Sequence, residues 1–348
     1  MDIKDFDPNG VGQDNGNYFG LPFSPEQSRL VLVSVPWDVT SSYGDGSRFA
    51  PDAIISASTQ LDLYDPLFPG GWREGIGTAG IDYTIQEKST FLRPEAAKVM
   101  ETLEHGGSML DDMLLRRRTE KVNESSEKLN NKVYDEVKKW LGEDKLVGLV
   151  GGDHSTPFGA IRAVAEREEG IGILHIDAHA DLRDTYEGFV NSHASIMFNV
   201  VTKIPQIARL VQVGIRDVSD GEIGFAASHE KIEMVPDWEL SAARFAGVSW
   251  DEQCDRIVGM LPDKVYISFD IDGLSPDNCP HTGTPVPGGL SFNEAVWLLE
   301  KVVRSGRRVV GFDLCEVSPA TNSEWDANVG ARMLYKLCNV ALKSVSGK

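Results

Sequence analysis

The chain has 348 residues, of which 41% are hydrophobic and 25% charged, so it can bury the core of one large domain or two modest ones. Its net charge of −19 argues against a general affinity for nucleic acid or anionic membranes, because both are polyanions. No apolar run approaches a membrane span, the N-terminus lacks the features of a signal peptide, and the four cysteines are scattered without a CxxC spacing. We therefore expect a cytoplasmic protein with reduced thiols.

Residues 1–28 predict an irregular N-terminal extension, and residues 29–348 a single domain. Along that domain, short runs of apolar residues alternate with helical patterns such as those of residues 157–168 and 293–304. Strands that are apolar throughout are typical of a sheet covered by helices on both faces. The alternation predicts a three-layer α/β/α fold with a largely parallel sheet. The predicted strands are residues 30–35, 146–150, 171–176, 210–215, 265–269 and 309–312.

One segment, residues 87–145, is charged and mostly helical in its pattern. We expect a pair of helices with a solvated outer face, packed on one face of the sheet. A regulatory arm or an oligomer contact is the alternative interpretation.

Polar residues follow several predicted strands, at the carboxyl edge where open parallel sheets build their sites. The strand 146–150 runs into Gly-Gly-Asp-His-Ser, where His154 would project from the sheet edge. Taken alone, this loop is equally well explained by Asp153 capping the next helix.

The strand 171–176 runs into Asp177, His179 and Asp181, which stand on alternate residues. Side chains at this spacing converge if the backbone stays extended. A polar triplet directly after a buried strand is costly unless it is paired or bound to a metal. This loop therefore favours a functional interpretation.

Two further strands also end in acids. The strand 265–269 delivers Asp270 and Asp272, whose like charges repel each other unless a cation lies between them. The last strand delivers Asp313 and then Glu316. Either of these two acids could cap a helix or lie exposed in a loop, but their place at a strand end favours function.

Together these loops offer two imidazoles and four aspartates, a set that suits two divalent ions bridged by carboxylates and a water. Ligation rich in carboxylates and free of thiols favours Mn²⁺, with Ni²⁺ as the alternative. Two such ions lower the pKa of the water between them, so that hydroxide is available near neutral pH to attack a trigonal carbon.

At these residues the sequence resembles the ureohydrolase (arginase/agmatinase) superfamily. Its GGDHS-type loop, DxHxD loop and SxDxDxxxP segment stand here in order at residues 151–155, 177–181 and 268–276. Residues 282–289, Thr-Gly-Thr-Pro-Val-Pro-Gly-Gly, also resemble the agmatinase-type TGTPxPGG stretch. The resemblance implies an arginase-like fold and hydrolysis of a C–N bond in a guanidino compound, with release of urea and an amine or ammonia.

The resemblance also implies roles for individual residues. One metal would be held by His154, Asp177, Asp181 and Asp270, and the other completed by His179 and Asp272. The implied catalytic residues are Asp181, Glu316, which accepts hydrogen bonds from the guanidinium, and His193, which shuttles a proton to the leaving amine. His175, inside a predicted strand, is interpreted as a core histidine.

Two departures from the family pattern bear on the substrate. Arginases carry asparagine where this chain has Arg183, so arginine is not expected as the substrate, and an agmatinase-like or small-guanidine hydrolase fits better. Arg183 could instead bind a substrate carboxylate, as a formiminoglutamase or guanidino-acid hydrolase would need, or form a salt bridge with Asp184 or Glu187. Trp37, in an altered loop, is expected to narrow the substrate pocket or simply to pack.

Two other classes of protein remain alternatives. A zinc deacetylase on a related fold needs one metal and would leave the second set of ligands without a use. A non-catalytic paralogue would bind metal and act as an assembly partner. By resemblance we expect a homo-oligomer, a trimer or a hexamer.

Overall fold

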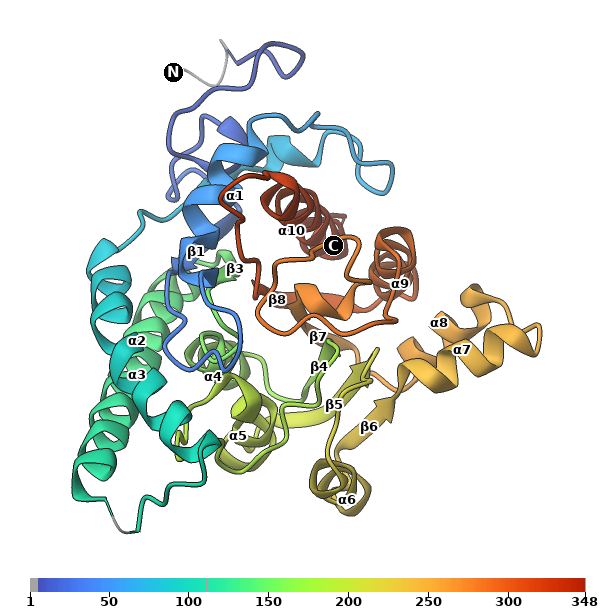
Figure 1. The fold of residues 1–348 in the computed structure, drawn as a ribbon. Helices are drawn as coiled ribbons and strands as arrows, with labels where there is room; N and C mark the ends of the chain where they lie inside the picture. The colour runs from blue at the N-terminus through green and yellow to red at the C-terminus, as the bar shows by residue number, and fades with distance from the viewer. Residues whose placement is uncertain (1–5, 111, 348) are drawn as a thin grey trace.

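The computed structural model describes residues 6–110 and 112–347, which surround one eight-stranded sheet (Figure 1). All neighbouring strands are parallel, in the order β2-β1-β3-β8-β7-β4-β5-β6. The six predicted strands are confirmed, and the sheet adds β2 and β6 at its two edges. The strands are β1 (Leu30–Val35), β2 (Ile76–Thr78), β3 (Leu146–Gly151), β4 (Ile171–Ile176), β5 (Ile207–Val213), β6 (Ile232–Val235), β7 (Lys264–Asp270) and β8 (Arg308–Cys315).

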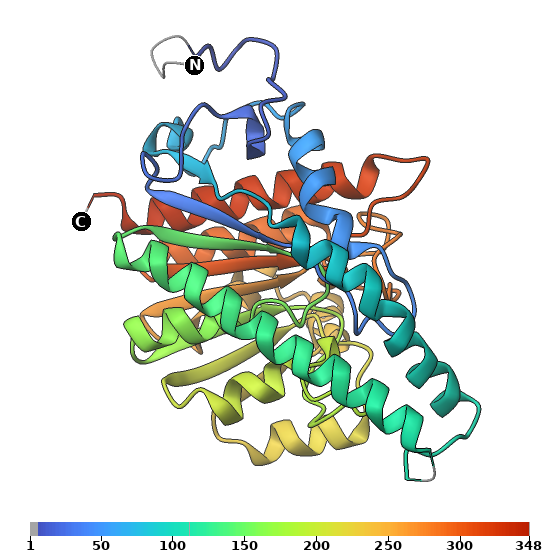
Figure 2. The same cartoon turned by 90° about the vertical axis from the view of Figure 1, so that its left-hand side faces the viewer.

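Helices cover both faces of this sheet, as the apolar strands require. In β1, Leu30 and Leu32 point into one core and Val31 and Val33 into the other. The first core is closed by α1 (Ala50–Ser58), α8 (Trp250–Gly259), α9 (Phe292–Arg304) and α10 (Trp325–Val345). The second is closed by α2 (Tyr83–Glu104), α3 (Met113–Gly142), α4 (Phe158–Arg167) and α5 (Ile196–Lys203). Figure 2 shows α3 in front of the strands and α10 behind them, so the predicted three-layer fold is confirmed.

The remaining helices, α6 (Asp220–Ser228) and α7 (Asp237–Phe245), follow β5 and β6 near one edge of the sheet. The charged segment forms α2 and α3, which pack on each other and, through α3, on α4. The buried side of α3 is an apolar stripe at helical spacing that includes Leu115, Val122 and Leu129. No helix within the described ranges is long and apolar enough to cross a membrane.

Residues 6–28 contain one short 3₁₀ turn, Tyr18–Gly20, and otherwise irregular backbone. The Tyr18 hydroxyl lies 2.8 Å from Ser34 Oγ on β1, and the Phe19 ring packs edge-on against Tyr335 of α10. This part of the extension is therefore fixed to β1, next to the edge strand β2.

Four adjacent strands, β3, β8, β7 and β4, bring their carboxyl ends together in the middle of the sheet. These are the strands after which the sequence places its histidines and acids. The fold therefore gathers into one place residues that are more than 150 positions apart, such as His154 and Glu316.

Candidate metal centre and active site

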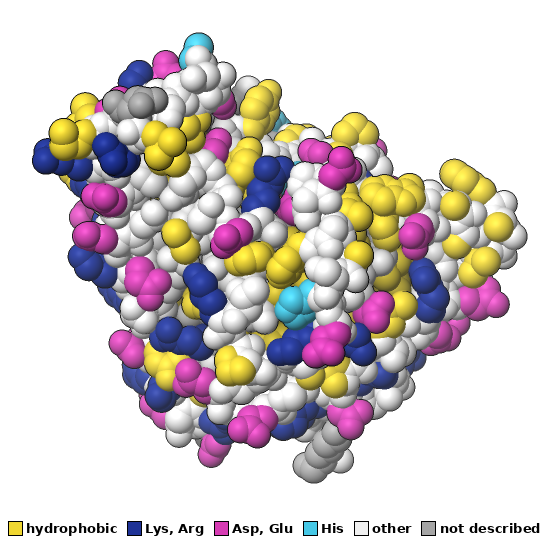
Figure 3. Space-filling view, turned by 90° about the horizontal axis from the view of Figure 1, so that it is seen from below, with side chains coloured by type: hydrophobic (Ala, Val, Ile, Leu, Met, Phe, Trp, Pro, Cys, Tyr) yellow, Lys and Arg dark blue, Asp and Glu magenta, His cyan; other side chains and the backbone are white. Residues whose placement is uncertain are grey.

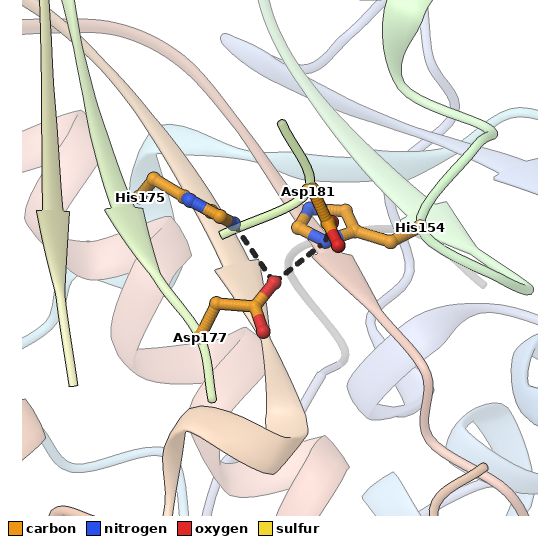
Figure 4. A group of neighbouring side chains, drawn as sticks. All are labelled: His154, His175, Asp177 and Asp181. Atoms are coloured by element: carbon orange, nitrogen blue, oxygen red, sulfur yellow. Dashed lines mark hydrogen bonds and ion pairs between the residues drawn. The ribbon is translucent and has the colours of Figure 1, made fainter. Parts of the chain in front are cut away.

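The first cluster of ligand-type side chains surrounds His154 (Figure 4). His154 Nδ1 lies 3.0 Å from Asp177 Oδ2, 3.1 Å from Asp181 Oδ2 and 3.3 Å from Asp270 Oδ2. All four side chains are buried. Three carboxylates thus approach His154 Nδ1, the residues that the sequence analysis proposed for the first metal. The group whose ligand atoms lie within 4.8 Å of one another is made of His154, Asp177, Asp181 and His175, and Asp270 adjoins it through His154.

The second cluster shares Asp177 with the first. His179 Nδ1 lies 3.4 Å from Asp177 Oδ1 and 3.1 Å from Asp272 Oδ2. Asp177 therefore turns one oxygen towards each cluster. A carboxylate in this position is suited to bridge two ions.

Local backbone geometry positions these candidate ligands. Asp181 has a φ of 54°, in the left-handed region that non-glycine residues rarely adopt. The backbone is therefore not extended at this residue, and this changes the direction of its side chain. The turn before His154 needs glycine, because a Cβ on Gly152 would lie 2.0 Å from Trp37 O. Hydrogen bonds hold two further candidate ligands: Asp270 Oδ1 accepts from the backbone N–H of Asp272, and Asp272 Oδ1 accepts from that of Ala178.

The electrostatics of the clusters call for cations. Burial, together with the charges of Asp272 and Asp177, raises the pKa of Asp270 well above its ordinary value. Burial and Asp177 also raise the pKa of Asp181 to about 6. Divalent ions among these carboxylates remove the repulsion, and four aspartates with two imidazoles are a donor set that such ions prefer. The residues present therefore fit a binuclear centre.

His175 was interpreted as a core histidine, and the structure refines this interpretation. It is fully buried, but its Nε2 lies 2.8 Å from Asp177 Oδ2 (Figure 4). Its Nδ1 lies 2.9 Å from Gln212 Nε2. The signal was present in the sequence, because residues two apart on a strand point to the same face. His175 thus belongs to the same group of side chains as His154 and Asp181, and its imidazole is suited to orient the Asp177 carboxylate.

His154 is oriented in a similar way, through the ring nitrogen that faces away from the aspartates of the first cluster. Its Nε2 lies 2.9 Å from Ser268 Oγ, and that hydroxyl donates to Asp313 Oδ1 at 3.0 Å. Asp313, which the sequence analysis left without a role, groups with His154 and Cys315 and contacts His154 through the Ser268 hydroxyl, a position suited to an outer partner of that imidazole.

A cleft of about 140 Å³ opens beside the second cluster, with His179, Asp181, His193, Ser42, Arg183 and Glu222 among its lining residues. His193 Nε2 lies 3.4 Å from Ser42 Oγ. Burial, followed by the charges of His179 and His154, lowers the pKa of His193 to about 3. The His193 imidazole is therefore neutral in the cleft near pH 7. Sequence reasoning missed Ser42.

Glu316 lies at the end of β8, buried beside His154. Its Oε1 accepts a hydrogen bond from the backbone N–H of His154 at 2.9 Å. Its Oε2 faces Gly283 and receives no hydrogen bond within the described part of the chain. Burial, followed by the charge of Asp153, raises the pKa of Glu316 well above its ordinary value, so this carboxyl gains from a cationic partner.

Of the other two residues predicted to contact the substrate, one lines the cleft and the other does not. Arg183 lines the cleft and its ion-pair partner is Glu222, at 3.6 Å, and not Asp184 or Glu187. Trp37 does not reach the cleft: it is 1% exposed and packs in the core beside α2 and α3. We therefore no longer assign Trp37 a contact with the substrate.

Comparison with known proteins agrees with this geometry. The model of the Arginase family matches residues 28–339. The chain belongs to the Arginase family. It is 32% identical over 318 residues to N(1)-aminopropylagmatine ureohydrolase of Thermus thermophilus, covering 91% of each chain. It is 29% identical over 329 residues to proclavaminate amidinohydrolase of Streptomyces clavuligerus, covering 92% of each.

The fold of this Arginase family chain also matches solved structures. A structure of the Streptomyces clavuligerus amidinohydrolase superposes with a TM-score of 0.71, at 24% identity, over 96% of this chain and 99% of that one. The chain is thus a metal-dependent amidinohydrolase acting on a guanidino compound, and the deacetylase and non-catalytic alternatives are set aside.

Proposed function

We propose that the two clusters hold two divalent ions and that the cleft beside them hydrolyses the C–N bond of a small guanidino compound. One observation carries the proposal: Asp177 faces His154 with one carboxylate oxygen and His179 with the other. Asp181 and Asp270 complete the first set, and Asp272 completes the second. Mn²⁺ suits this carboxylate-rich set, with Ni²⁺ as the alternative.

Two such ions would supply a water activated for attack at neutral pH. The residues around them bind and orient the substrate. The free Oε2 of Glu316 is suited to accept N–H groups of a planar guanidinium, and the positive charge of that group would lower the pKa that burial raises.

Proton transfer completes the reaction, in which the guanidino carbon gains the oxygen of water and loses a nitrogen. Asp181 lies at the junction of the first cluster and the cleft, where it would hold the attacking water in place. His193 is neutral, so its imidazole can take up a proton on one nitrogen and release one from the other. We assign it the transfer of a proton to the departing nitrogen, which leaves as an amine or ammonia while the rest leaves as urea.

Arginine itself is not the proposed substrate, because Arg183 stands in the cleft at the position that arginases use for the amino-acid end. A substrate like that of an agmatinase, or a small guanidine, fits the reaction centre. A guanidino or formimino acid is the second candidate, and the position of Arg183 in the cleft wall favours it.

We further propose a cytoplasmic homo-oligomer, a trimer or hexamer, that binds neither nucleic acid nor membrane. The acidic net charge of −19 supports the latter point. The face seen in Figure 3 also carries Lys and Arg side chains scattered among acidic ones.

Urea release tests this function. The protein, loaded with Mn²⁺ or Ni²⁺ in parallel, is incubated with a panel of guanidino and formimino compounds, and urea, formamide and ammonia are measured. We expect urea from at least one guanidino compound, in a 1:1 ratio to the substrate consumed. Metal-loaded protein that releases no urea from any of them would contradict the proposal.

A further inference from the structure

The strongest unexplained feature of the cleft is the guanidinium of Arg183. Its Cζ lies 4.5 Å from the centre of the Tyr186 ring, and its Nε lies 3.6 Å from Glu222 Oε2. The Tyr186 ring on one side and the Glu222 carboxylate near Nε thus favour this position of the guanidinium. Arg183 is the only Lys or Arg among the described residues that line the cleft.

Glu222 does not use up the donors of Arg183. The distance of 3.6 Å is too long for a hydrogen bond, and Glu222 is already engaged. Its Oε1 accepts from the backbone N–H of Leu182, and its Oε2 accepts from the backbone N–H and the hydroxyl of Ser219, which caps α6. Glu222 therefore anchors Arg183 but has little capacity left for a ligand.

The terminal nitrogens of Arg183 remain available. Neither Nη1 nor Nη2 has a hydrogen bond or an ion pair within residues 6–110 and 112–347. The side chain is 40% exposed, on the wall of the same cleft as His179 and His193. A fixed fork of free N–H donors matches the two oxygens of a carboxylate.

The acidic residues nearby do not cancel the preference of Arg183 for a carboxylate. Four aspartates among the ligands would be balanced by two divalent ions, and Glu316 by the substrate's guanidinium. Asp217 also lines the cleft, but it lies exposed, where water and salt screen its charge. Among the described residues that line the cleft, Arg183 is thus the cation whose terminal nitrogens lack hydrogen-bond partners.

We infer that Arg183 selects the charge of the substrate's tail: it pairs with the carboxylate of a short guanidino acid and disfavours a tail that carries a second positive charge. This inference rests on the proposed function and deepens it. It sets the chain apart from its relative from Thermus thermophilus, whose name specifies an aminopropylagmatine. Here Arg183 is a specificity-determining residue, and the metal ligands carry the reaction as before.

The test compares kcat/KM for urea release from 4-guanidinobutanoate and from agmatine, which present an anionic and a cationic tail at similar length. We expect the wild-type protein to prefer the acid by about 10- to 100-fold, the range of one hydrogen-bonded charge pair. Arg183→Gln should lower this ratio about tenfold or more, mainly through the KM of the acid. Arg183→Lys keeps the charge but loses the fork, and should give an intermediate ratio.

Arg162→Gln is the matched control, because the Arg162 guanidinium also lies over a tyrosine ring, that of Tyr134, but sits between α4 and α3 and does not line the cleft. It should leave the ratio unchanged. Preference of the wild-type protein for agmatine, or an equal loss on both substrates in Arg183→Gln, would overturn the inference and leave the proposed function standing. Absence of urea from every guanidino compound would overturn both.

Discussion

Asp177 Oδ2 lies 3.0 Å from His154 Nδ1, while the other oxygen of the same carboxylate faces the second cluster. One side chain therefore serves both halves of the proposed centre. Replacing it should disturb both ions, whereas the loss of a ligand to one ion only, such as Asp272, should spare the other.

We therefore expect Asp177→Asn to lose both bound ions and to reduce urea release by more than the ~10–100-fold that the loss of an outer partner costs. Metal analysis after desalting, together with the urea assay, measures this. Asp184→Asn, an exposed change in the same loop, is the control and should keep both ions. Retention of one or two ions with normal turnover in Asp177→Asn would contradict the bridging role.

The hydroxyl of Ser42 is the nearest partner of His193 Nε2, at 3.4 Å. Ser42→Ala should therefore reduce kcat by about 2- to 10-fold, the effect of one modest hydrogen bond, while His193→Ala should reduce it by about 10²- to 10⁴-fold. Metal content should not change in either variant. The neighbouring Ser41 is a matched control, because its buried hydroxyl has no partner among the described residues. Equal effects of Ser41→Ala and Ser42→Ala would argue against a role in proton transfer.

Asp313 supports His154 through Ser268. Asp313→Asn should weaken the affinity for the first ion by about 10- to 100-fold, because His154 loses part of the chain that orients it. A competition titration with a metal chelator measures the affinity. Asp326→Asn is the control, since Asp326 is also a fully buried aspartate but pairs with His281. Equal metal affinity in Asp313→Asn and the wild-type protein would refute the outer-partner role.

Glu187 gives a prediction for stability against pH. Burial, followed by the charge of Glu104, raises its pKa to about 7, above the ordinary value of 4.5. The folded state thus prefers the protonated form, and the stability that this form provides is lost as the pH rises from about 4.5 to about 7. Glu187→Gln keeps the shape without the charge, so it should raise Tm at pH 8 and change it little at pH 4.5. Thermal unfolding at both pH values measures this, with the exposed Glu143→Gln as control. An equal gain at both pH values would contradict the assigned cause.

The sequence predicted the central strands, and it proposed six metal ligands that the structure places at the carboxyl ends of those strands. Both predictions follow from local periodicity. Asp177, His179 and Asp181 stand at a spacing of two after an apolar strand. The parallel sheet then brings the carboxyl ends of its strands, and the residues that follow them, to one edge. The edge strands β2 and β6 were missed, since Ile76–Thr78 and Ile232–Val235 are too short to show a pattern.

Partners that are distant in sequence could not be predicted. Arg183 pairs with Glu222 across 39 positions, and nothing near Arg183 in the sequence distinguishes that carboxylate from Asp184 or Glu187. The large aromatic side chain of Trp37 suited the wall of a pocket, but the packing of α2 and α3 buries it. These outcomes depend on tertiary packing.

The central claim is that urea release depends on two ions held in one centre. The most direct measurement is a titration of metal-free protein with Mn²⁺, and in parallel with Ni²⁺, in which bound ions per chain and the rate of urea release are followed together. The account predicts that the rate rises to its maximum only as the second equivalent binds. Full activity at one ion per chain, or two bound ions without urea from any guanidino compound, would contradict it.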